Sequence, residues 1–326
     1  MTGLELSDRQ TVIGFDGSAG GMDALALGRE LAEVTASRPL VAIVLRIPDH
    51  LMDRADLEAV MRVESQPLVA LAEDRLAALS PETRVLIDDS PAHALRELVE
   101  AERPNLLVLG SARRGVIGRI LLGSVGASLL SGAPCAIAVA PRGFAQRQGA
   151  ELVRIGAAFD GSEEAWTALA AAASLAARLH GELTILAVAE PSSGIVVEAL
   201  AEGEWRPSIE RRLDDALAEA RAAIPDGVAT HRRLLIGEPA AALARAAEAL
   251  DLLVVGSRGY GPIRRTLLGT TSERLMRTAP CPVLVIPRGA GEDPLGLGGV
   301  RLSRRGRAAT DARTELSGAG RWGQAP

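Results

Sequence analysis

The chain has 326 residues and a formal net charge of −5, with 48% hydrophobic and 24% charged residues. These proportions are typical of a globular protein, and the length favours two domains. The acidic balance argues against general nucleic-acid binding, which needs a basic surface. All 36 basic residues are arginine, which excludes a phosphate loop ending in Gly-Lys and any chemistry at a lysine amine.

The start of the chain is polar, and its first apolar run is too short for a signal-peptide core. No apolar run reaches the roughly 20 residues of a membrane span. We therefore expect a cytoplasmic protein that does not contact membrane. Cys135 and Cys281 each follow Ala-Pro at matching places in the chain. We interpret both cysteines as small buried hydrophobic residues.

Residues 1–145 alternate between short apolar runs and segments with helical spacing. The apolar runs predict strands at 11–16, 40–47, 83–87, 106–109 and 135–140. The helical spacing predicts helices at 22–36, 54–79, 92–102 and 124–130. Continuous Val/Ile/Leu strands between helices predict an α/β domain with an open, doubly wound parallel sheet.

The same order repeats in the second half of the chain. Phe-Asp-Gly-Ser begins at Phe15 and again at Phe159, 144 residues later, and four further shared motifs all recur at an offset of 146. The second copy predicts strands at 152–159, 183–189, 229–236, 252–255 and 283–286, and helices at 165–179, 208–223, 240–250 and 272–277. We assign domain 1 to residues 1–145, domain 2 to residues 150–290, and a mobile tail to residues 291–326.

A glycine-rich turn follows the fourth predicted strand of domain 2. Gly256-Ser-Arg-Gly259 is followed by nine residues and then by Gly269-Thr270-Thr271, which opens a helix. Ligands of such sheets bind at the carboxyl ends of the strands, and backbone N–H groups at a helix N-terminus bind phosphate. The alternative is that the glycines only make a tight turn and that Thr270 only caps the helix.

Asp160 follows the first predicted strand of domain 2, next to that turn. Its carboxylate can accept hydrogen bonds from a ribose hydroxyl or an adenine amine. The alternative is that Asp160 caps the following helix, a role for which Ser162 competes.

With these motifs, the chain resembles the universal stress protein family over both domains. Domain 2 matches that family's ATP-binding pattern G-x2-G-x9-G-[ST] at Gly256, Gly259, Gly269 and Thr270. The Asp-Gly-Ser turn and the Cys-Pro-Val-Leu-Val-Ile-Pro sequence at 281–287 are also similar to the family.

The resemblance implies two five-stranded parallel sheets of flavodoxin-like order 3-2-1-4-5, as in the adenine nucleotide alpha hydrolase-like fold. It implies that Asp160 and Val188 contact the nucleoside, and that ribose and phosphates contact Gly256, Gly259, Gly269, Thr270 and Thr271. The ligand would be ATP, with or without Mg²⁺; AMP, ADP and a cyclic nucleotide are the alternatives. The last strands, 136–140 and 283–286, would pair the two domains, and a homodimer and an unidentified protein partner are further expectations.

Domain 1 keeps the spacing of this motif but not all of its residues. The equivalents of the domain 2 site are Asp16, Gly110, Gly123 and Ser124, whereas Arg113 stands in place of Gly259. A side chain is unfavourable where the backbone must approach a phosphate closely. Asp89, which we align with Gly237, adds a negative charge. We hypothesise that domain 1 binds ATP weakly or not at all; the alternative is that Arg113 and Arg114 hold the phosphates directly.

No arrangement of residues for catalytic turnover is visible in the sequence. The four histidines share no motif, and the pair Asp88-Asp89 is interpreted as exposed charge. Three classes of function stay open: an ATP-binding regulatory module, a slow ATPase, and a dimerising stress-response scaffold that binds no nucleotide. The first class is the one that the resemblance favours, with ATP bound mainly by domain 2.

Overall fold

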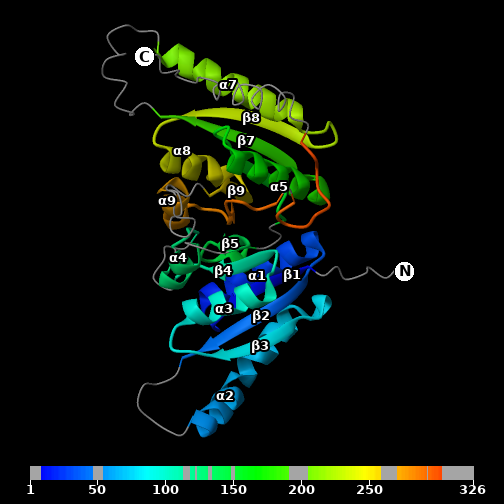
Figure 1. Ribbon diagram of the computed structural model, residues 1–326, viewed down its shortest axis with the longest axis vertical. Helices are drawn as coiled ribbons and strands as arrows, with labels where there is room; N and C mark the ends of the chain where they lie inside the picture. The colour runs from blue at the N-terminus through cyan, green and yellow to red at the C-terminus, as the bar shows by residue number, and fades with distance from the viewer. Residues whose placement is uncertain are drawn as a thin grey trace, which may run out of the picture.

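The structure is a computed structural model that describes residues 9–46, 54–112, 118–121, 123–130, 134–147, 151–190, 205–257, 270–291 and 293–302. The described strands form one ten-stranded sheet in the order β3-β2-β1-β4-β5-β10-β9-β6-β7-β8. Each half of this sheet has the predicted order 3-2-1-4-5, which confirms the α/β fold of two tandem domains (Figure 1).

The strands lie close to the apolar runs from which they were predicted. Their bounds are β1 (Gln10–Phe15), β2 (Arg38–Leu45), β3 (Glu82–Ile87), β4 (Leu106–Gly110), β5 (Ala136–Ala140), β6 (Arg154–Ala158), β7 (Glu182–Ala189), β8 (Ala229–Ile236), β9 (Leu252–Gly256) and β10 (Val283–Ile286). All neighbouring strands are parallel except β5 and β10, which are antiparallel with Val139 opposite Val283. The predicted pairing of the domains through their last strands is therefore confirmed.

The described α-helices connect the strands and cover both faces of the sheet. Their bounds are α1 (Ala19–Thr35), α2 (Arg54–Arg75), α3 (Pro91–Glu102), α4 (Ser124–Leu130), α5 (Glu163–Leu179), α7 (Trp205–Ala223), α8 (Pro239–Ala246) and α9 (Thr270–Thr278). Short 3₁₀ turns follow at η1 (Ala77–Leu79), η2 (Phe144–Gln146) and η3 (Ala247–Ala249). The helices predicted at 54–79 and 240–250 thus end early, because their last turns tighten into 3₁₀ geometry. Among the described residues, no helix has the length and apolarity needed to cross a membrane.

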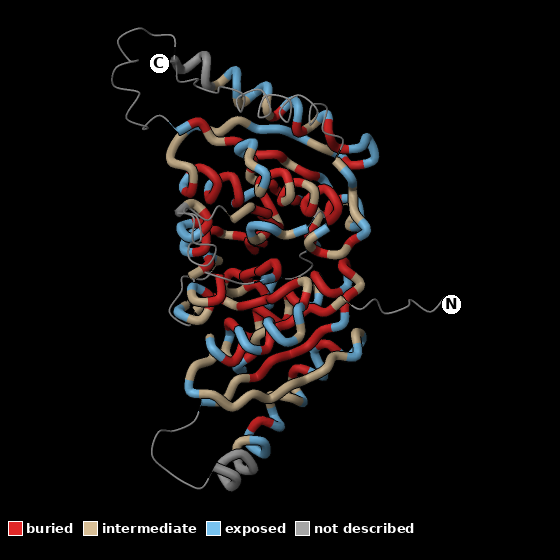
Figure 2. Tube along the Cα trace, viewed as in Figure 1, coloured by how far each residue is buried: buried red, intermediate tan, exposed pale blue. Residues whose placement is uncertain are grey.

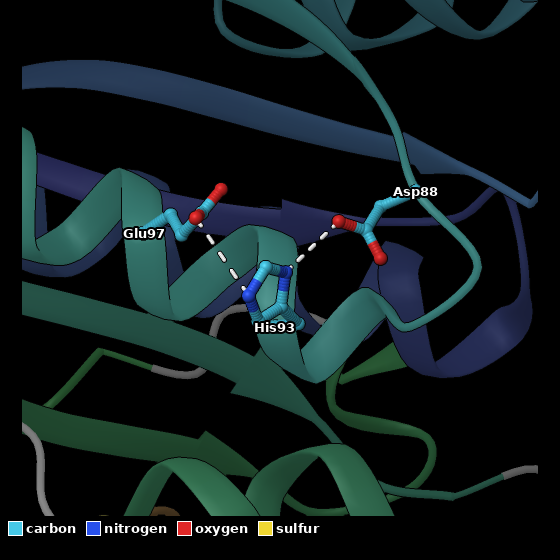
Figure 3. A group of neighbouring side chains, drawn as sticks. All are labelled: Asp88, His93 and Glu97. Atoms are coloured by element: carbon cyan, nitrogen blue, oxygen red, sulfur yellow. Dashed lines mark hydrogen bonds and ion pairs between the residues drawn. The ribbon is translucent and has the colours of Figure 1, made fainter.

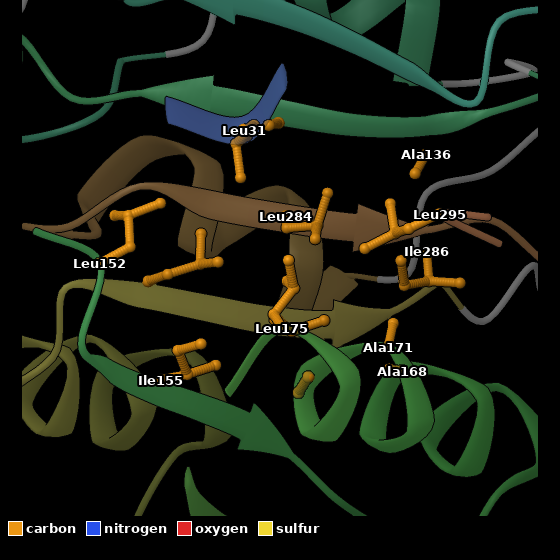
Figure 4. Packing of buried hydrophobic residues seen from close by; sticks show 14 of the residues in the cluster. Leu31, Ala136, Leu152, Ile155, Ala168, Ala171, Leu175, Leu284, Ile286 and Leu295 are labelled. Carbon is orange, nitrogen blue, oxygen red and sulfur yellow. The ribbon is translucent and has the colours of Figure 1, made fainter. Parts of the chain in front are cut away.

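Two hydrophobic cores lie on opposite faces of the sheet. Helices α1, α2, α5 and α7 contribute to one core, and α3, α4, α8 and α9 to the other. The first core is continuous across the two domains: Leu31 of α1 belongs to the same cluster as Leu175 of α5 and Leu284 of β10 (Figure 4). Buried residues accordingly run through the centre of the molecule, from one domain into the other (Figure 2).

Part of the segment predicted as a mobile tail packs on domain 2. Leu295 and Leu297 are 1% and 4% exposed, and both belong to the core shared by α1 and α5. The Ser174 hydroxyl accepts a hydrogen bond of 2.9 Å from the Val300 N–H, and Arg178 donates to the Leu297 carbonyl at 3.0 Å. The prediction of a tail that begins at residue 291 is therefore wrong for residues 293–302. Residues 303–326 lie outside the described part of the chain.

Candidate nucleotide site

The Asp-Gly-Ser turns connect the first strand of each domain to the next helix. In domain 2, Asp160 Oδ1 accepts hydrogen bonds from the N–H and the hydroxyl of Ser162, at 2.9 and 2.6 Å. Ser162 in turn caps α5 by accepting from the Ala165 N–H at 3.2 Å. Gly161 makes the turn with a φ of +80°, and the same turn orients Asp16 in domain 1. The serine is therefore the helix cap, and the aspartate orients the serine.

Strands β4 and β9 each end in a glycine, Gly110 and Gly256, and packing requires a glycine at both positions. A Cβ on Gly256 would lie 2.6 Å from the carbonyl oxygen of Glu164, in the first turn of α5. A Cβ on Gly110 would overlap the carbonyl oxygen of Gly20, in the first turn of α1. Neither glycine has a positive φ. Close approach of a helix to a strand end thus accounts for both glycines without a ligand, a reason that the sequence pattern alone did not reveal.

A pocket of about 280 Å³ opens at the carboxyl ends of β1 and β4 in domain 1. All four candidate residues of domain 1 line it: Asp16, Gly110, Gly123 and Ser124. Apolar side chains of α3 and of strands β2 and β4 complete its wall, among them Val44, Leu95 and Leu109. The fold therefore brings together residues that are as far as 108 positions apart in the sequence.

The equivalent residues of domain 2 occupy equivalent strand ends. Asp160 follows β6, Val188 is the penultimate residue of β7, and Gly256 ends β9. Helix α9 begins at Thr270, with Thr271 in its first turn. The two other candidates, Gly259 and Gly269, lie outside the described residues.

Two differences in side-chain size distinguish the domains at this place. Strand register makes Leu186 the equivalent of Ala42, which lines the domain 1 pocket. Glu164 stands at the position of Gly20, and its carboxylate lies 3.3 Å from Arg288 Nε. Sequence reasoning missed this glutamate, whose negative charge Arg288 offsets.

The expected alignment of Asp89 with Gly237 is wrong by one residue. The Gly237 N–H donates to the Ala189 carbonyl at 3.0 Å, and in domain 1 the Asp88 N–H makes the same bond to Leu45, at 3.1 Å. The turn between β3 and α3 is therefore one residue longer than its counterpart in domain 2. The acidic residue at the end of β3 is Asp88.

Asp88 forms an ion-pair cluster with His93 and Glu97 of α3 (Figure 3). His93 Nδ1 lies 3.0 Å from Asp88 Oδ2, and Nε2 lies 3.6 Å from Glu97 Oε1. The hydrogen bond that His93 donates to Asp88 raises the pKa of His93 and lowers the pKa of Asp88. Both ring nitrogens face carboxylates, which favours the imidazolium form, and that form has no lone pair for a metal. We therefore assign the cluster to ion pairing.

The two cysteines are buried, as the sequence predicted. Burial raises the pKa of both Cys135 and Cys281 to about 12. Their thiols are therefore protonated near neutral pH and are poor nucleophiles.

Comparison with known proteins identifies the family of this chain. The sequence model of the universal stress protein family matches residues 9–141 and again residues 152–287. A universal stress protein of Thermus aquaticus is 38% identical over 134 residues, 40% of this chain and 94% of that protein. The universal stress protein Rv2319c of Mycobacterium tuberculosis is 24% identical over 296 residues, 85% of this chain and 99% of its own length.

The fold has a counterpart among solved structures. A universal stress protein from Archaeoglobus fulgidus superposes with a TM-score of 0.65 at 22% identity, covering 87% of this chain and 100% of that chain. At this level of identity the likeness supports the fold. Together with the two matches to the family model, it leads to one conclusion: the chain belongs to the universal stress protein family and contains two copies of its domain in tandem.

Proposed function

We propose that this protein is a nucleotide-responsive regulatory module of stress adaptation that binds ATP mainly in domain 2. The pocket of domain 1, around which Asp16, Gly110, Gly123 and Ser124 gather, supports a ligand site at this place in the fold. The complete glycine pattern of the sequence supports its assignment to domain 2. Asp160 and Gly256 occupy the equivalent strand ends in domain 2, where the glycine pattern of the sequence is complete.

In this proposal the nucleoside lies between β6 and β7, next to Asp160 and Val188. The phosphates lie at the N-terminus of α9, where Thr270 and Thr271 begin the helix. The N–H groups of a first helical turn lack partners within the helix, and the helix dipole favours an anion there. This site needs no lysine, in keeping with a chain that has none.

Domain 1 retains a pocket at the equivalent place but lacks the second glycine of the motif. Arg113 at that position disfavours close backbone approach to a phosphate. We infer that domain 1 binds nucleotide more weakly than domain 2.

A regulatory role is favoured over catalysis by the chemistry of the pocket lining. The described lining of the domain 1 pocket contains neither histidine nor cysteine, and Asp16 is its acidic residue. In domain 1 a single carboxylate among serines and apolar residues offers no pair of groups for acid–base or nucleophilic turnover. In domain 2 Glu164 adds a second carboxylate at the position of Gly20, and it is ion-paired with Arg288. A single-turnover assay for ADP release tests the alternative of a slow ATPase.

A scaffold without nucleotide is the second candidate. Two observations favour it: packing alone explains Gly256, and one continuous sheet already unites the domains. Mass spectrometry of small molecules retained by the purified protein separates the two candidates, and it distinguishes ATP from AMP, ADP and a cyclic nucleotide. A cytoplasmic location, a further homodimer and a protein partner are part of the same proposal.

Calorimetric titration of the full chain with ATP tests the proposal, with and without Mg²⁺. The matched variants Asp160→Ala and Asp16→Ala remove the same side chain from equivalent turns. We expect Asp160→Ala to remove most of the heat of binding and Asp16→Ala to leave most of it. Equal losses in the two variants would contradict the assignment to domain 2, and no binding by the unchanged protein would favour the scaffold.

A further inference from the structure

The segment 118–121 of domain 1, which we call the loop end, makes hydrogen bonds to domain 2. The Ile120 N–H donates to the carbonyl of Ala279 at 2.9 Å, and Arg119 Nη1 donates to the carbonyl of Thr278 at 2.8 Å. Ile120 is 1% exposed, and Arg119 Nη2 lies 3.9 Å from Glu248 Oε1. The loop end is thus docked on the C-terminus of α9, in the other domain.

The same loop end borders the pocket of domain 1. The Ala112 N–H donates to the Leu121 carbonyl at 2.8 Å, and the Leu121 N–H donates to the Ser111 hydroxyl at 3.3 Å. Ser111 and Ala112 both line the pocket. A displacement of the loop end from α9 would therefore move Leu121, whose hydrogen-bond partners Ser111 and Ala112 form part of the pocket wall.

Helix α9 connects the loop end of domain 1 with the proposed phosphate position of domain 2. It has only nine residues, with the proposed phosphate position of domain 2 at its N-terminus and the loop end of domain 1 at its C-terminus. A helix this short has little stability of its own. Leu275 and Met276 pack it into the core, and groups bound at its two ends add to that stability. An anion at the N-terminus and the Arg119 guanidinium at the C-terminus both interact favourably with the helix dipole.

We propose that α9 couples the two nucleotide sites. Binding of ATP to domain 2 would strengthen the contact between the loop end and α9, and would thereby stabilise the wall of the domain 1 pocket. The proposal rests on ATP binding by domain 2. The sign is positive because phosphate and Arg119 stabilise the same helix, and thermodynamic linkage makes the effect reciprocal. Arg119 is a positioning residue in this scheme: it contacts α9 and no nucleotide.

Amide hydrogen exchange in the full-length chain tests the coupling, with ATP as the probe. Asp16→Ala serves as the background, so that a response of the loop end does not come from nucleotide in domain 1. In this background we expect ATP to slow exchange of the Ile120 amide by about fivefold or more. Adding Arg119→Ala should remove that slowing and weaken ATP binding to domain 2 by about fivefold.

Arg147→Ala is the matched control. Its side chain also donates across the domain boundary, to the Pro280 carbonyl at 2.8 Å, but it lies outside the loop end. We expect this control to keep the ATP response of Ile120. If Arg119→Ala and Arg147→Ala change the ATP response of the Ile120 amide equally, the proposed coupling through the loop end is wrong.

The same measurements distinguish a failure of the coupling from a failure of ATP binding by domain 2. If ATP protects the amides of α9 but leaves Ile120 unchanged, the coupling is wrong and nucleotide binding by domain 2 stands. If ATP protects no amide and gives no heat of binding in the unchanged protein, both proposals fall.

Discussion

The carboxylate of Asp23 accepts a hydrogen bond of 2.8 Å from the backbone N–H of Ala145, 122 residues further along the chain. Its other oxygen accepts from the Gly143 N–H at 2.9 Å. Asp23 lies on α1 and is fully buried, so desolvation raises its pKa although both of these hydrogen bonds oppose the rise. The carboxylate therefore fixes the start of the connection between the domains to the first helix.

Asp23→Ala should lower the stability of the protein by about 2–4 kcal/mol, because it removes two backbone hydrogen bonds to a fully buried carboxylate. Asp293→Ala is a matched control. Asp293 also accepts two backbone N–H bonds, from Leu297 and Gly298, but it is exposed, and water can replace it. Urea denaturation measures both variants; equal losses would show that burial of Asp23 is not the source of its effect.

The side chain of Glu30 makes the free energy of unfolding depend on pH. Burial raises its pKa from 4.5 to about 7, and its Oε2 has no hydrogen-bond partner among the described residues. A carboxyl whose folded pKa is raised favours folding below its unfolded pKa, and this contribution is lost as the pH rises through about 7. Ionised Glu30 is therefore destabilising in mildly alkaline solution.

Glu30→Gln should stabilise the protein at pH 8 by about 1–2 kcal/mol, after allowance for partial exposure of the side chain. The gain should shrink steadily as the pH falls toward 5. Thermal unfolding at a series of pH values measures it, with exposed Glu100→Gln as the control. A gain that does not depend on pH would show that ionisation of Glu30 is not its cause.

The cluster of Asp88, His93 and Glu97 predicts a histidine that titrates above its usual range. Asp88→Asn should lower the pKa of His93, because their hydrogen bond is the largest cause of the rise. Glu97→Gln should lower it less, since Nε2 lies 3.6 Å from that carboxylate. An NMR titration of the His93 ring protons measures both effects, and an unchanged pKa in Asp88→Asn would contradict the geometry.

The ion pair should stabilise α3 between two pH limits. The raised pKa of His93 supplies stability below its unfolded pKa, and this stability is lost as the pH rises through the folded value. The lowered pKa of Asp88 supplies stability that is lost as the pH falls below its unfolded value. The sequence pattern does not show this pair, because it depends on how the turn after β3 meets α3.

The positions of the strands were predictable because parallel strands buried on both faces are continuous apolar runs, such as Leu106–Gly110. Their order was implied by the resemblance to the universal stress protein family. The site was predictable only in part. The position of Asp160 follows from its place after a strand, but the packing role of Gly256 depends on the carbonyl of Glu164, 92 residues earlier in the sequence. Burial of Leu295 was missed because a segment rich in glycine, arginine, alanine and serine is typical of a mobile tail.

Buried thiols give a further test of the interface between the domains. Cys135 precedes β5 and Cys281 precedes β10, and each has a pKa raised to about 12 by burial. At pH 8 we expect a thiol reagent to label neither cysteine in the folded protein at an appreciable rate, and both in urea. Rapid labelling of the folded protein would mean that β5 and β10 separate readily in solution.

Substitution of two glycines of the domain 2 motif should affect different properties, the stability of the fold in one case and ATP binding in the other. Gly256→Ala places a Cβ 2.6 Å from the Glu164 carbonyl oxygen, so it should destabilise the fold by about 1–3 kcal/mol. Gly259→Arg reproduces the residue that domain 1 carries at this position, so it should abolish ATP binding by domain 2. Urea denaturation and calorimetric titration of both variants measure the two effects separately. If Gly259→Arg binds ATP with unchanged affinity, the loop does not hold the phosphates, and the difference between the domains must be sought at Glu164 and Leu186, where side-chain size and charge also change.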